Sequence, residues 1–402
     1  MKIDIFYLIL FAGLAIRLTL AFLPGFYIDT NVWYAWALRL NESTFNNFYS
    51  PTVWTNYTPG YLYILSFLGA IRNLFNLDNN SFYYLLKLPA IFSEVVLAAI
   101  LYKVALPKSK QLAKILAVFI IFNPALIFNS SIWGQIDGML TLALFSSIYL
   151  LTINKLIWSA ALFGLAILLK PQALALTPVF LLFLINRFSI KSTLQLIVPT
   201  ALILFLFSLP FFITNPIFGP LQLLSKMVDD YPLNSLFAYN FWGMLGFWIN
   251  DGTFWQNLTY RGWGLLLISF YWLLITFFYI RRKLNLLNLA TLALISFFFL
   301  PTRAHERYLY PGLVFLTISA WYFKSRVLII LTFILSVIHL LNLYFVYVYY
   351  NEIFQHQPYL FYWEPLYNLL DKGGKVFSFF STIMFIVLSY LILKLSHDKK
   401  VH

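Results

Sequence analysis

Long, unbroken apolar runs recur along the whole chain, and few charges separate them. Only 10% of the 402 residues are charged, whereas 61% are hydrophobic. Because soluble domains carry roughly a quarter charged residues, this chain cannot cover a water-facing surface. Backbone groups in lipid must be hydrogen-bonded within the protein, and continuous runs favour helices over the alternating strands of a barrel. The sequence therefore predicts an all-α membrane protein.

Twelve of these apolar stretches are candidate membrane helices. We expect a polytopic chain with about 12 transmembrane helices, forming a single membrane domain over residues 1–402. The stretches are 5–23, 84–103, 113–128, 137–153, 156–169, 172–186, 193–213, 262–280, 284–301, 308–323, 326–347 and 374–394.

The charge pattern decides how a further apolar stretch, 61–75, is placed. A basic cluster of Lys103, Lys108, Lys110 and Lys114 should face the cytoplasm, because short cytoplasmic loops are rich in Lys and Arg. It does so if 61–75 is an interfacial or re-entrant helix on the outer side. Both termini are then cytoplasmic, and the long, aromatic-rich outer loops are about 24–83, 214–261 and 348–373.

Composition and missing motifs exclude several kinds of chemistry. The net charge of +13 is explained by cytoplasmic loops, so no nucleic-acid partner is expected. The chain has no cysteine, and therefore no thiol nucleophile or thiolate metal site. It also lacks a Walker loop and a Gly-rich dinucleotide motif. Any energy-rich donor should therefore arrive through the membrane.

The first candidate residue is Asp29, the first acid of the first outer loop, within the aromatic segment 26–36. A carboxylate at the membrane rim can accept a proton from a hydroxyl. As an equal alternative, Asp29 caps a helix that begins near Asn31. Further along the loop, Tyr57 opens a motif whose Pro59-Gly60 pair should form a turn before the interfacial helix.

A second group of candidates lies where two later helices begin or end. Trp133, Gln135 and Asp137 combine a stacking ring with hydrogen-bonding groups, as a sugar site requires. The alternative for Asp137 is simply a favourable position at a helix N-terminus. Lys170 departs from the positive-inside trend and needs a partner, which is either an anionic phosphate or one of the carboxylates of Glu94 and Asp137.

The most charged candidate segment is 301–311, at the outer edge of a predicted helix, with Arg303, His305, Glu306 and Arg307. We expect Arg303 and Arg307 to lie one helical turn apart and to share a phosphate. The alternative is an ion-pair network with Glu306. We favour a functional role of this segment over an ion-pair network, because charged residues at this depth are usually functional.

Some charges fall inside predicted spans. Glu94 lies well within the stretch 84–103, on the same helix face as Lys87, and should be paired. Arg17 interrupts the first stretch, where snorkelling of its side chain towards the interface is the expected explanation.

Taken in order, these motifs resemble those of the GT-C superfamily, membrane glycosyltransferases that use polyprenyl-phosphate sugars. The resemblance is to the dolichyl-phosphate-glucose glucosyltransferases of N-glycan assembly and to prokaryotic mannosyltransferase-like relatives, and it covers most of the chain. The matching segments are Asp29, Tyr57-Thr58-Pro59-Gly60-Tyr61, Trp133-Gly134-Gln135-Ile136-Asp137, Lys170-Pro171-Gln172 and His305-Glu306-Arg307-Tyr308.

The resemblance implies a GT-C fold with interfacial helices in the first outer loop, and a role for each motif. Asp29 resembles the catalytic base. The expected donor-phosphate ligands are His305, Arg303, Arg307 and Lys170. The expected substrate-binding residues are Trp133, Gln135, Asp137, Glu306, Tyr57 and Glu94. Thr30 stands where metal-assisted branches carry a second acid, so no metal or other cofactor is expected.

The implied activity is an inverting transfer of a hexose, mannose or glucose, from a polyprenyl-phosphate donor to a lipid-linked glycan or other acceptor. The enzyme would act as a monomer in the plasma membrane of a prokaryote, with its site on the extracytoplasmic side. One alternative is a glycolipid transporter or flippase, and another is a non-catalytic assembly subunit. Polar motifs gathered at one face, without the midplane breaks typical of transporters, favour the enzyme.

Overall fold

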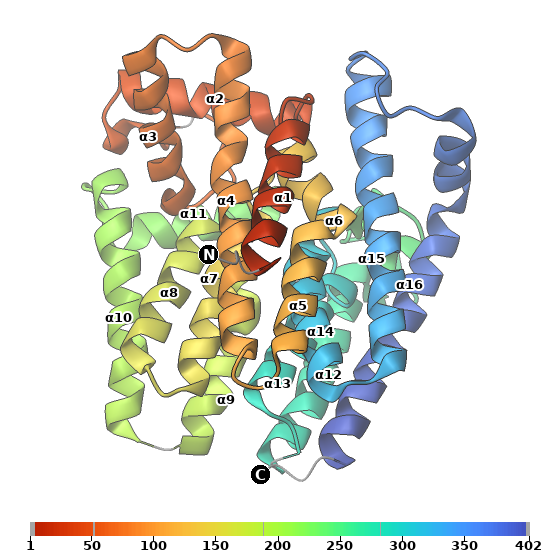
Figure 1. Cartoon of the computed structure of the whole chain (residues 1–402). Helices are drawn as coiled ribbons and strands as arrows, with labels where there is room; N and C mark the ends of the chain where they lie inside the picture. The colour runs from red at the N-terminus through yellow and green to blue at the C-terminus, as the bar shows by residue number, and fades with distance from the viewer. Residues whose placement is uncertain (1–4, 51–52, 188, 282, 399–402) are drawn as a thin grey trace.

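The computed structural model describes residues 5–50, 53–187, 189–281 and 283–398. It is 78% helical with little strand, which confirms the predicted all-α class. Figure 1 shows a bundle in which the long helices α4, α10, α15 and α16 run along one common direction. The α-helices are α1 (Ile5–Leu20), α2 (Tyr27–Glu42), α3 (Pro59–Phe75), α4 (Asn79–Ala105), α5 (Lys110–Phe122), α6 (Pro124–Ile127), α7 (Asp137–Thr152), α8 (Leu156–Leu169), α9 (Thr177–Arg187), α10 (Ile190–Ser208), α11 (Phe218–Asp229), α12 (Tyr260–Ile280), α13 (Leu286–Phe299), α14 (Leu309–Phe323), α15 (Arg326–Tyr347) and α16 (Glu364–Asp398).

Short elements join these helices. The 3-10 helices are η1 (Phe45–Asn47), η3 (Pro171–Leu176), η4 (Leu209–Phe211), η5 (Trp242–Met244) and η6 (Glu306–Tyr308), and the π-helices are η2 (Phe128–Trp133) and η7 (Val348–Phe354). Strand β1 (Ser235–Leu236) pairs in parallel with β4 (Ala304–His305), and β2 (Phe254–Trp255) pairs antiparallel with β3 (Leu258–Thr259). The β1–β4 pair joins two segments that are distant in sequence and fixes the start of the 304–308 motif.

The number of membrane-length helices is smaller than the twelve predicted spans. Among the described residues, five helices are long and apolar enough to cross a membrane, or six if the bent pair Lys110–Phe122 and Pro124–Trp133 counts as one span. The structure therefore does not show twelve spans, although a helix lies within each of the twelve predicted stretches. The five helices are Asn79–Ala105, Ile190–Phe211, Tyr260–Ile280, Arg326–Phe354 and Glu364–Asp398.

Helices extend from both ends into the predicted outer loop 348–373. The helix that ends at Tyr347 continues as η7, and α16 begins at Glu364, ten residues before the predicted start at 374. The remaining loop is closed by Glu352, whose carboxylate accepts the backbone N–H groups of Phe361 at 2.9 Å and Tyr362 at 2.7 Å. Helix α16 passes through Gly374, where the ring of Phe247 packs closely, since an added Cβ would lie 2.9 Å from Phe247 Cε2.

The first outer loop folds into a cap with its own apolar core. Helices α2 and α3 pack against each other and lie at the upper end of the bundle in Figure 1. Trp33 and Trp36 from α2 and Tyr61 and Leu65 from α3 are buried in this core. The stretch 61–75 is thus a helix in a cap, and it is not one of the membrane-length helices. Its interfacial position on the outer side stays a prediction.

The larger core lies within the bundle, where α7 packs on α8, α8 on α10, and α13 on α14. Helix α1 crosses α5 at Gly13, where an added Cβ would lie only 1.8 Å from Cγ2 of Ile121. The absence of a side chain at Gly13 is therefore what permits the two helices to pack at this distance.

We expect Gly13→Val to lower the apparent melting temperature of the purified protein, because overpacking a helix crossing costs about 1–3 kcal/mol. The matched control is Gly373→Ala, since a Cβ at this helical glycine meets only the movable ring of Phe377 at 3.2 Å. Equal melting temperatures for the two variants would contradict the close α1–α5 crossing.

Candidate functional site

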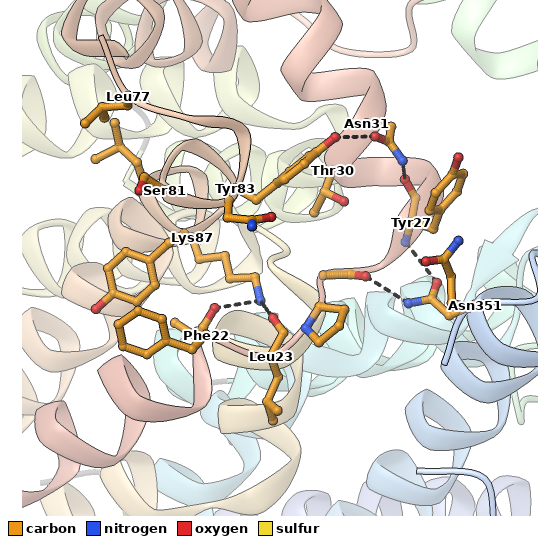
Figure 2. A pocket seen from close by; sticks show the side chains of 17 residues that line it. Phe22, Leu23, Tyr27, Thr30, Asn31, Leu77, Ser81, Tyr83, Lys87 and Asn351 are labelled. Atoms are coloured by element: carbon orange, nitrogen blue, oxygen red, sulfur yellow. Dashed lines mark hydrogen bonds between the residues drawn. The ribbon is translucent and has the colours of Figure 1, made fainter. Parts of the chain in front are cut away.

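The site is built around the start of α2, which carries Asp29. The segment before this helix is held on two sides. The Asn351 side chain accepts from Tyr27 N at 2.9 Å and donates to Gly25 O at 2.8 Å, as Figure 2 shows. On the other side, Phe26 N donates to Trp133 O at 2.9 Å, and the two rings stack with centroids 4.1 Å apart. These contacts fix the first turn of α2 against the Trp133 segment.

Asp29 does not cap a helix. The N-cap of α2 is Phe26, and Asp29 lies within the first turn. Its half-buried carboxylate instead accepts two hydrogen bonds at one oxygen, Oδ2, from Trp133 Nε1 at 2.9 Å and Gln135 Nε2 at 2.5 Å. The capping alternative is therefore wrong, and the other oxygen, Oδ1, accepts no hydrogen bond from the described residues.

The Trp133–Asp137 motif forms the sharp turn that presents these donors. The π-helix η2 ends at Gly134, whose φ of 94° lies in the left-handed region that favours glycine. Gln135 N then donates to Asn129 O at 2.9 Å, and α7 begins at Asp137. Trp133 and Gln135 can therefore bond Asp29 while Asp137 accepts from Asn129 and Lys170.

Lys170 is the other charged centre of this turn. Its Nζ donates to Asp137 Oδ1 at 2.6 Å and to Gln135 Oε1 at 2.7 Å, and the lysine is only 3% exposed. Tyr57 also donates to Gln135 Oε1, at 3.3 Å. Of the two carboxylates expected as partners of Lys170, Asp137 is the one that it bonds. Gln135 connects the two charged groups, because its amide donates to Asp29 and its carbonyl oxygen accepts from Lys170.

The Tyr57–Tyr61 motif ties the cap to this centre. Thr58 Oγ1 donates to the carbonyl oxygens of Ile167 at 3.1 Å and Leu168 at 2.8 Å, at the end of α8. Gly60 lies against the same turn, where an added Cβ would be 2.5 Å from Leu168 O. Helix α3 thus docks on the residues that precede Lys170, which agrees with the predicted structural role of this motif.

Arg303 and Arg307 do not lie one helical turn apart, so this prediction is wrong. Arg303 has a φ of 68° and precedes β4, whose pairing with β1 keeps residues 304–305 extended. Its guanidinium is bound by two acids, with Nε 2.6 Å from Asp251 Oδ2 and Nη1 3.0 Å from Asp229 Oδ1. Arg303 therefore already has carboxylate partners and lies at the rim of the site.

Arg307 points into the site. It donates to Glu306 Oε1 at 2.9 Å, and its Cζ lies 6.0 Å from the centroid of the Trp133 ring. Its buried Nε has no hydrogen-bond partner among the described residues. Burial opposes the charged form of Arg307, but the nearby carboxylates of Asp29 and Glu306 raise its pKa. Arg307 is therefore a charged donor with unused hydrogen-bonding capacity.

His305 and Glu306 flank this cation in a buried setting. Burial lowers the pKa of His305 well below its usual value, and the positive charges of Arg307 and Lys170 lower it further. Burial raises the pKa of Glu306, although Arg307 counteracts the effect. The imidazole is therefore neutral near pH 7, and the positive charge of this segment resides on Arg307.

A cavity of about 360 Å³ opens beside these groups. Lys170, His305 and Arg307 line its polar side, and Leu224, Met227 and Val228 from α11 line its apolar side. Asp29 is not in the lining and lies beyond Tyr57 and Gln135. The cavity therefore combines cations with an apolar wall, as an amphipathic anion requires.

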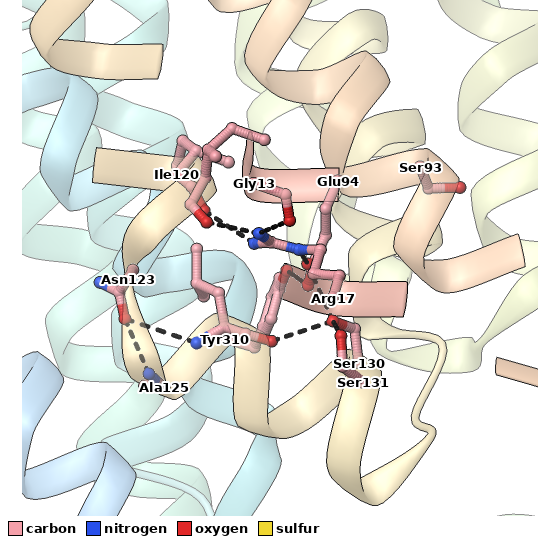
Figure 3. Close-up of polar contacts among 12 residues, drawn as sticks. Gly13, Arg17, Ser93, Glu94, Ile120, Asn123, Ala125, Ser130, Ser131 and Tyr310 are labelled. Atoms are coloured by element: carbon pink, nitrogen blue, oxygen red, sulfur yellow. Dashed lines mark hydrogen bonds and ion pairs between the residues drawn. The ribbon is translucent and has the colours of Figure 1, made fainter. Parts of the chain in front are cut away.

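Glu94 lies outside this cluster. Figure 3 shows Glu94 in a buried network in which its carboxylate accepts three hydrogen bonds. Arg17 Nε donates at 2.6 Å, Ser130 Oγ donates at 2.8 Å, and the Tyr310 hydroxyl donates as well. The Arg17 guanidinium further bonds the carbonyl oxygens of Ile120 and Ile121 at the α5–α6 break. Because Arg17 is fully buried, snorkelling is the wrong explanation for it.

The structure thus brings together Asp29, Tyr57, Trp133, Gln135, Asp137, Lys170, His305, Glu306 and Arg307, and it places Arg303 at the rim and Glu94 in a neighbouring network. Sequence reasoning missed Asp251, the buried partner of Arg303, because a single acid in a long loop carries no motif. It also missed Tyr231, which lines the cavity, and gave no role to Tyr308, which lies in the matched motif and lines it too. Among the described residues, no group of three His, Asp or Glu could hold a metal ion.

We expect Glu94→Leu to destabilise the protein strongly, because removing one member of a buried ion pair costs about 3–5 kcal/mol. The double variant Arg17→Met, Glu94→Leu should recover much of this loss, since no charge is left buried without a partner. Apparent melting temperatures measure both effects, with the exposed Glu364→Leu as control. A double variant no more stable than Glu94→Leu would show that the ion pair is not the cause.

The lowered pKa of His305 predicts a pH-dependent contribution to stability. The unfolded chain takes up a proton at His305 as the pH falls through about 6.5, whereas the folded protein does not. Stability from this group is therefore full above pH 6.5 and is lost as the pH falls. When the pH is lowered from 7.5 to 5.5, the apparent melting temperature of His305→Gln should fall less than that of the unaltered protein. The control variant His356→Gln, at an exposed position, should not show this smaller fall. Equal falls in His305→Gln, His356→Gln and the unaltered protein would refute the prediction.

No family model and no curated protein matches the chain. The chemistry of the site is therefore argued from its own residues.

Proposed function

We propose that the protein is a glycosyltransferase of the GT-C type, which transfers a hexose from a polyprenyl-phosphate donor to a hydroxyl of a glycan or lipid acceptor. One observation carries the proposal. A carboxylate with one unbonded oxygen, Asp29, is linked through a single amide, Gln135, to a buried lysine at the wall of a cationic cavity. A base and an anion site are the two parts that such a transfer needs.

The transfer forms one bond and breaks one. The acceptor oxygen attacks the anomeric carbon of the donor sugar, while Asp29 Oδ1 takes the hydroxyl proton. The bond between the anomeric carbon and the phosphate oxygen breaks, and its electron pair leaves with the polyprenyl phosphate. Attack from the face opposite the phosphate inverts the anomeric configuration, so no enzyme-bound sugar intermediate is needed. Trp133 and Gln135 hold Asp29 Oδ2 and leave Oδ1 for the acceptor.

The cations of the cavity stabilise the leaving group. Charge builds on the phosphate as the bond breaks, and donors already oriented in a buried site stabilise it most effectively. Arg307 has an unpaired buried Nε for this purpose, and Lys170 lies in the same lining. Neutral His305 contributes a hydrogen bond, while Glu306 orients Arg307.

The donor's lipid chain would leave the cavity along α11. Leu221 and Val228 of this helix are 59% and 53% exposed, so an apolar path leads away from Arg307. We further propose the twelve-span topology with its basic loops in the cytoplasm, which puts the site on the extracytoplasmic face of a prokaryotic plasma membrane. In this scheme the enzyme acts as a monomer without a metal or other cofactor.

We expect Asp29→Asn to lower the turnover of a polyprenyl-phosphate hexose at least 100-fold, because positioned general bases contribute about 10²–10⁴-fold. The amide has nearly the same size as the carboxylate, so the melting temperature should change little. Asp371→Asn, at an exposed position of α16, is the matched control and should retain full turnover. Full turnover by Asp29→Asn would disprove the proposed base.

The same assay separates the alternative functions. A glycolipid transporter would move the donor across a liposome without releasing free polyprenyl phosphate. A non-catalytic assembly subunit would leave the glycan products unchanged when either Asp29 or His305 is substituted. Release of polyprenyl phosphate that depends on Asp29 excludes both.

A further inference from the structure

A second and larger cavity, of about 620 Å³, lies between the end of α1, the start of α2, the start of α4 and the loop after η7. Tyr27, Thr30 and Asn31 of α2 contribute to its lining. These three residues share one helix face because they are three and four positions apart, whereas Asp29 lies on the opposite face. The helix that carries Asp29 therefore has the proposed transfer centre on one face and this cavity on the other.

The lining is rich in rings and amides. Four of its residues are aromatic, namely Phe22, Tyr27, Tyr83 and Tyr84, and four are amides, namely Asn31, Asn80, Asn351 and Gln357. Phe22 and Tyr84 stack with centroids 4.5 Å apart. Within the described part of the chain, the Asn80 amide and the hydroxyls of Tyr27 and Tyr84 make no hydrogen bond. Such free amides and hydroxyls, next to ring faces, match a polyhydroxylated ring.

The charge of the cavity restricts the ligand further. Among the described residues that line it, Lys87 is the one that carries a charge, and none is an acid. Figure 2 shows Lys87 directed at the turn after α1, where Nζ donates to Ala21 O at 3.1 Å and Leu23 O at 2.6 Å; it also donates to Ser131 O at 3.1 Å. All three N–H groups are thus used by backbone oxygens, but the positive charge has no carboxylate partner among the described residues. A cationic ligand is therefore disfavoured.

We propose that this cavity binds a saccharide of about two rings, neutral or acidic but without an ammonium group. Its volume falls within the range of roughly 300–1,000 Å³ typical of ligand pockets. Because the cavity lies across α2 from Asp29, the rings held here are not the ones that react. They belong to the part of an acceptor glycan behind the attacking hydroxyl. Only this acceptor role rests on the proposed function; saccharide binding does not.

Binding is tested on the full-length protein in phosphatidylcholine nanodiscs, because maltoside detergents are themselves disaccharides. Saturation-transfer NMR is recorded with three probes: a neutral disaccharide, a uronate-containing disaccharide and a protonated amino disaccharide. We expect the first two to bind saturably and the third at least tenfold more weakly. Absence of binding by all three, or equal binding of the amino probe, would overturn the proposal.

Variants locate the binding. Tyr84→Ala and Asn80→Ala remove a hydroxyl and an amide that make no hydrogen bond to the described residues, so the fold should persist, and each should weaken binding at least fivefold. Phe67→Ala, at a 65% exposed position of α3 outside the cavity, is the control and should bind normally. Unchanged binding in both cavity variants would place the saccharide elsewhere and refute this site.

The acceptor role has its own readout. In the transfer assay, Tyr84→Ala should raise the KM for a glycan acceptor while kcat stays near its original value, because the lost contact is equally present in the ground and transition states. If the protein binds saccharides but transfers no hexose, the proposed function fails and the site stands. If it transfers hexose with an unchanged acceptor KM in Tyr84→Ala, the acceptor role fails and the proposed function stands.

Discussion

The Gln135 side chain links the two halves of the site. Its amide nitrogen donates to Asp29 at 2.5 Å, and its oxygen accepts from Lys170 at 2.7 Å and from Tyr57 at 3.3 Å. One planar group thereby sets the separation between the acid on α2 and the lysine after α8. The left-handed turn at Gly134 makes this placement possible, because it redirects the chain between η2 and α7. Without this bridge, Asp29 would keep only Trp133 as a hydrogen-bond partner.

Burial gives these few polar contacts their strength. Electrostatic interactions are stronger in a poorly polarisable interior than in water, and an unpaired polar group there is correspondingly costly. The Glu94 network shows how the bundle supports the site. Glu94 binds Ser130 on η2, which leads to Trp133, and Tyr310 at the start of α14, which follows Arg307. Arg17 neutralises this carboxylate and joins it to the α5–α6 break. The Glu94 carboxylate therefore connects the chain segment that bonds Asp29 with the chain segment that carries Arg307.

The positions of most helices could be predicted from the sequence, but which charged side chains bond one another could not. Apolar periodicity located a helix in every predicted stretch, and the boundaries of α8 and α15 agree with the ranges 156–169 and 326–347. The helical segments inside loop 348–373 were not predicted, because apolar runs define only the ranges 326–347 and 374–394, whereas the chain is helical through η7 and again from Glu364. The prediction for Arg303 was wrong because the contacts that set its backbone conformation are distant in sequence. Local spacing predicted a helical turn with Arg307, whereas pairing with the distant strand β1 and the buried Asp251 imposed another backbone conformation. Arg17 and Glu94 were both noted as charges that need explanation, but nothing local indicates that residues 77 positions apart form a pair.

We propose that Asp29, Gln135, Lys170 and Arg307 together form a site for inverting sugar transfer. The most direct measurement incubates the purified protein with a polyprenyl-phosphate hexose of known anomeric configuration and a glycan acceptor, and identifies both products by mass spectrometry and NMR. We expect one free polyprenyl phosphate for each glycoside formed, with the opposite anomeric configuration in the glycoside. A glycoside of retained configuration, or a donor that crosses the bilayer intact without releasing phosphate, would contradict it.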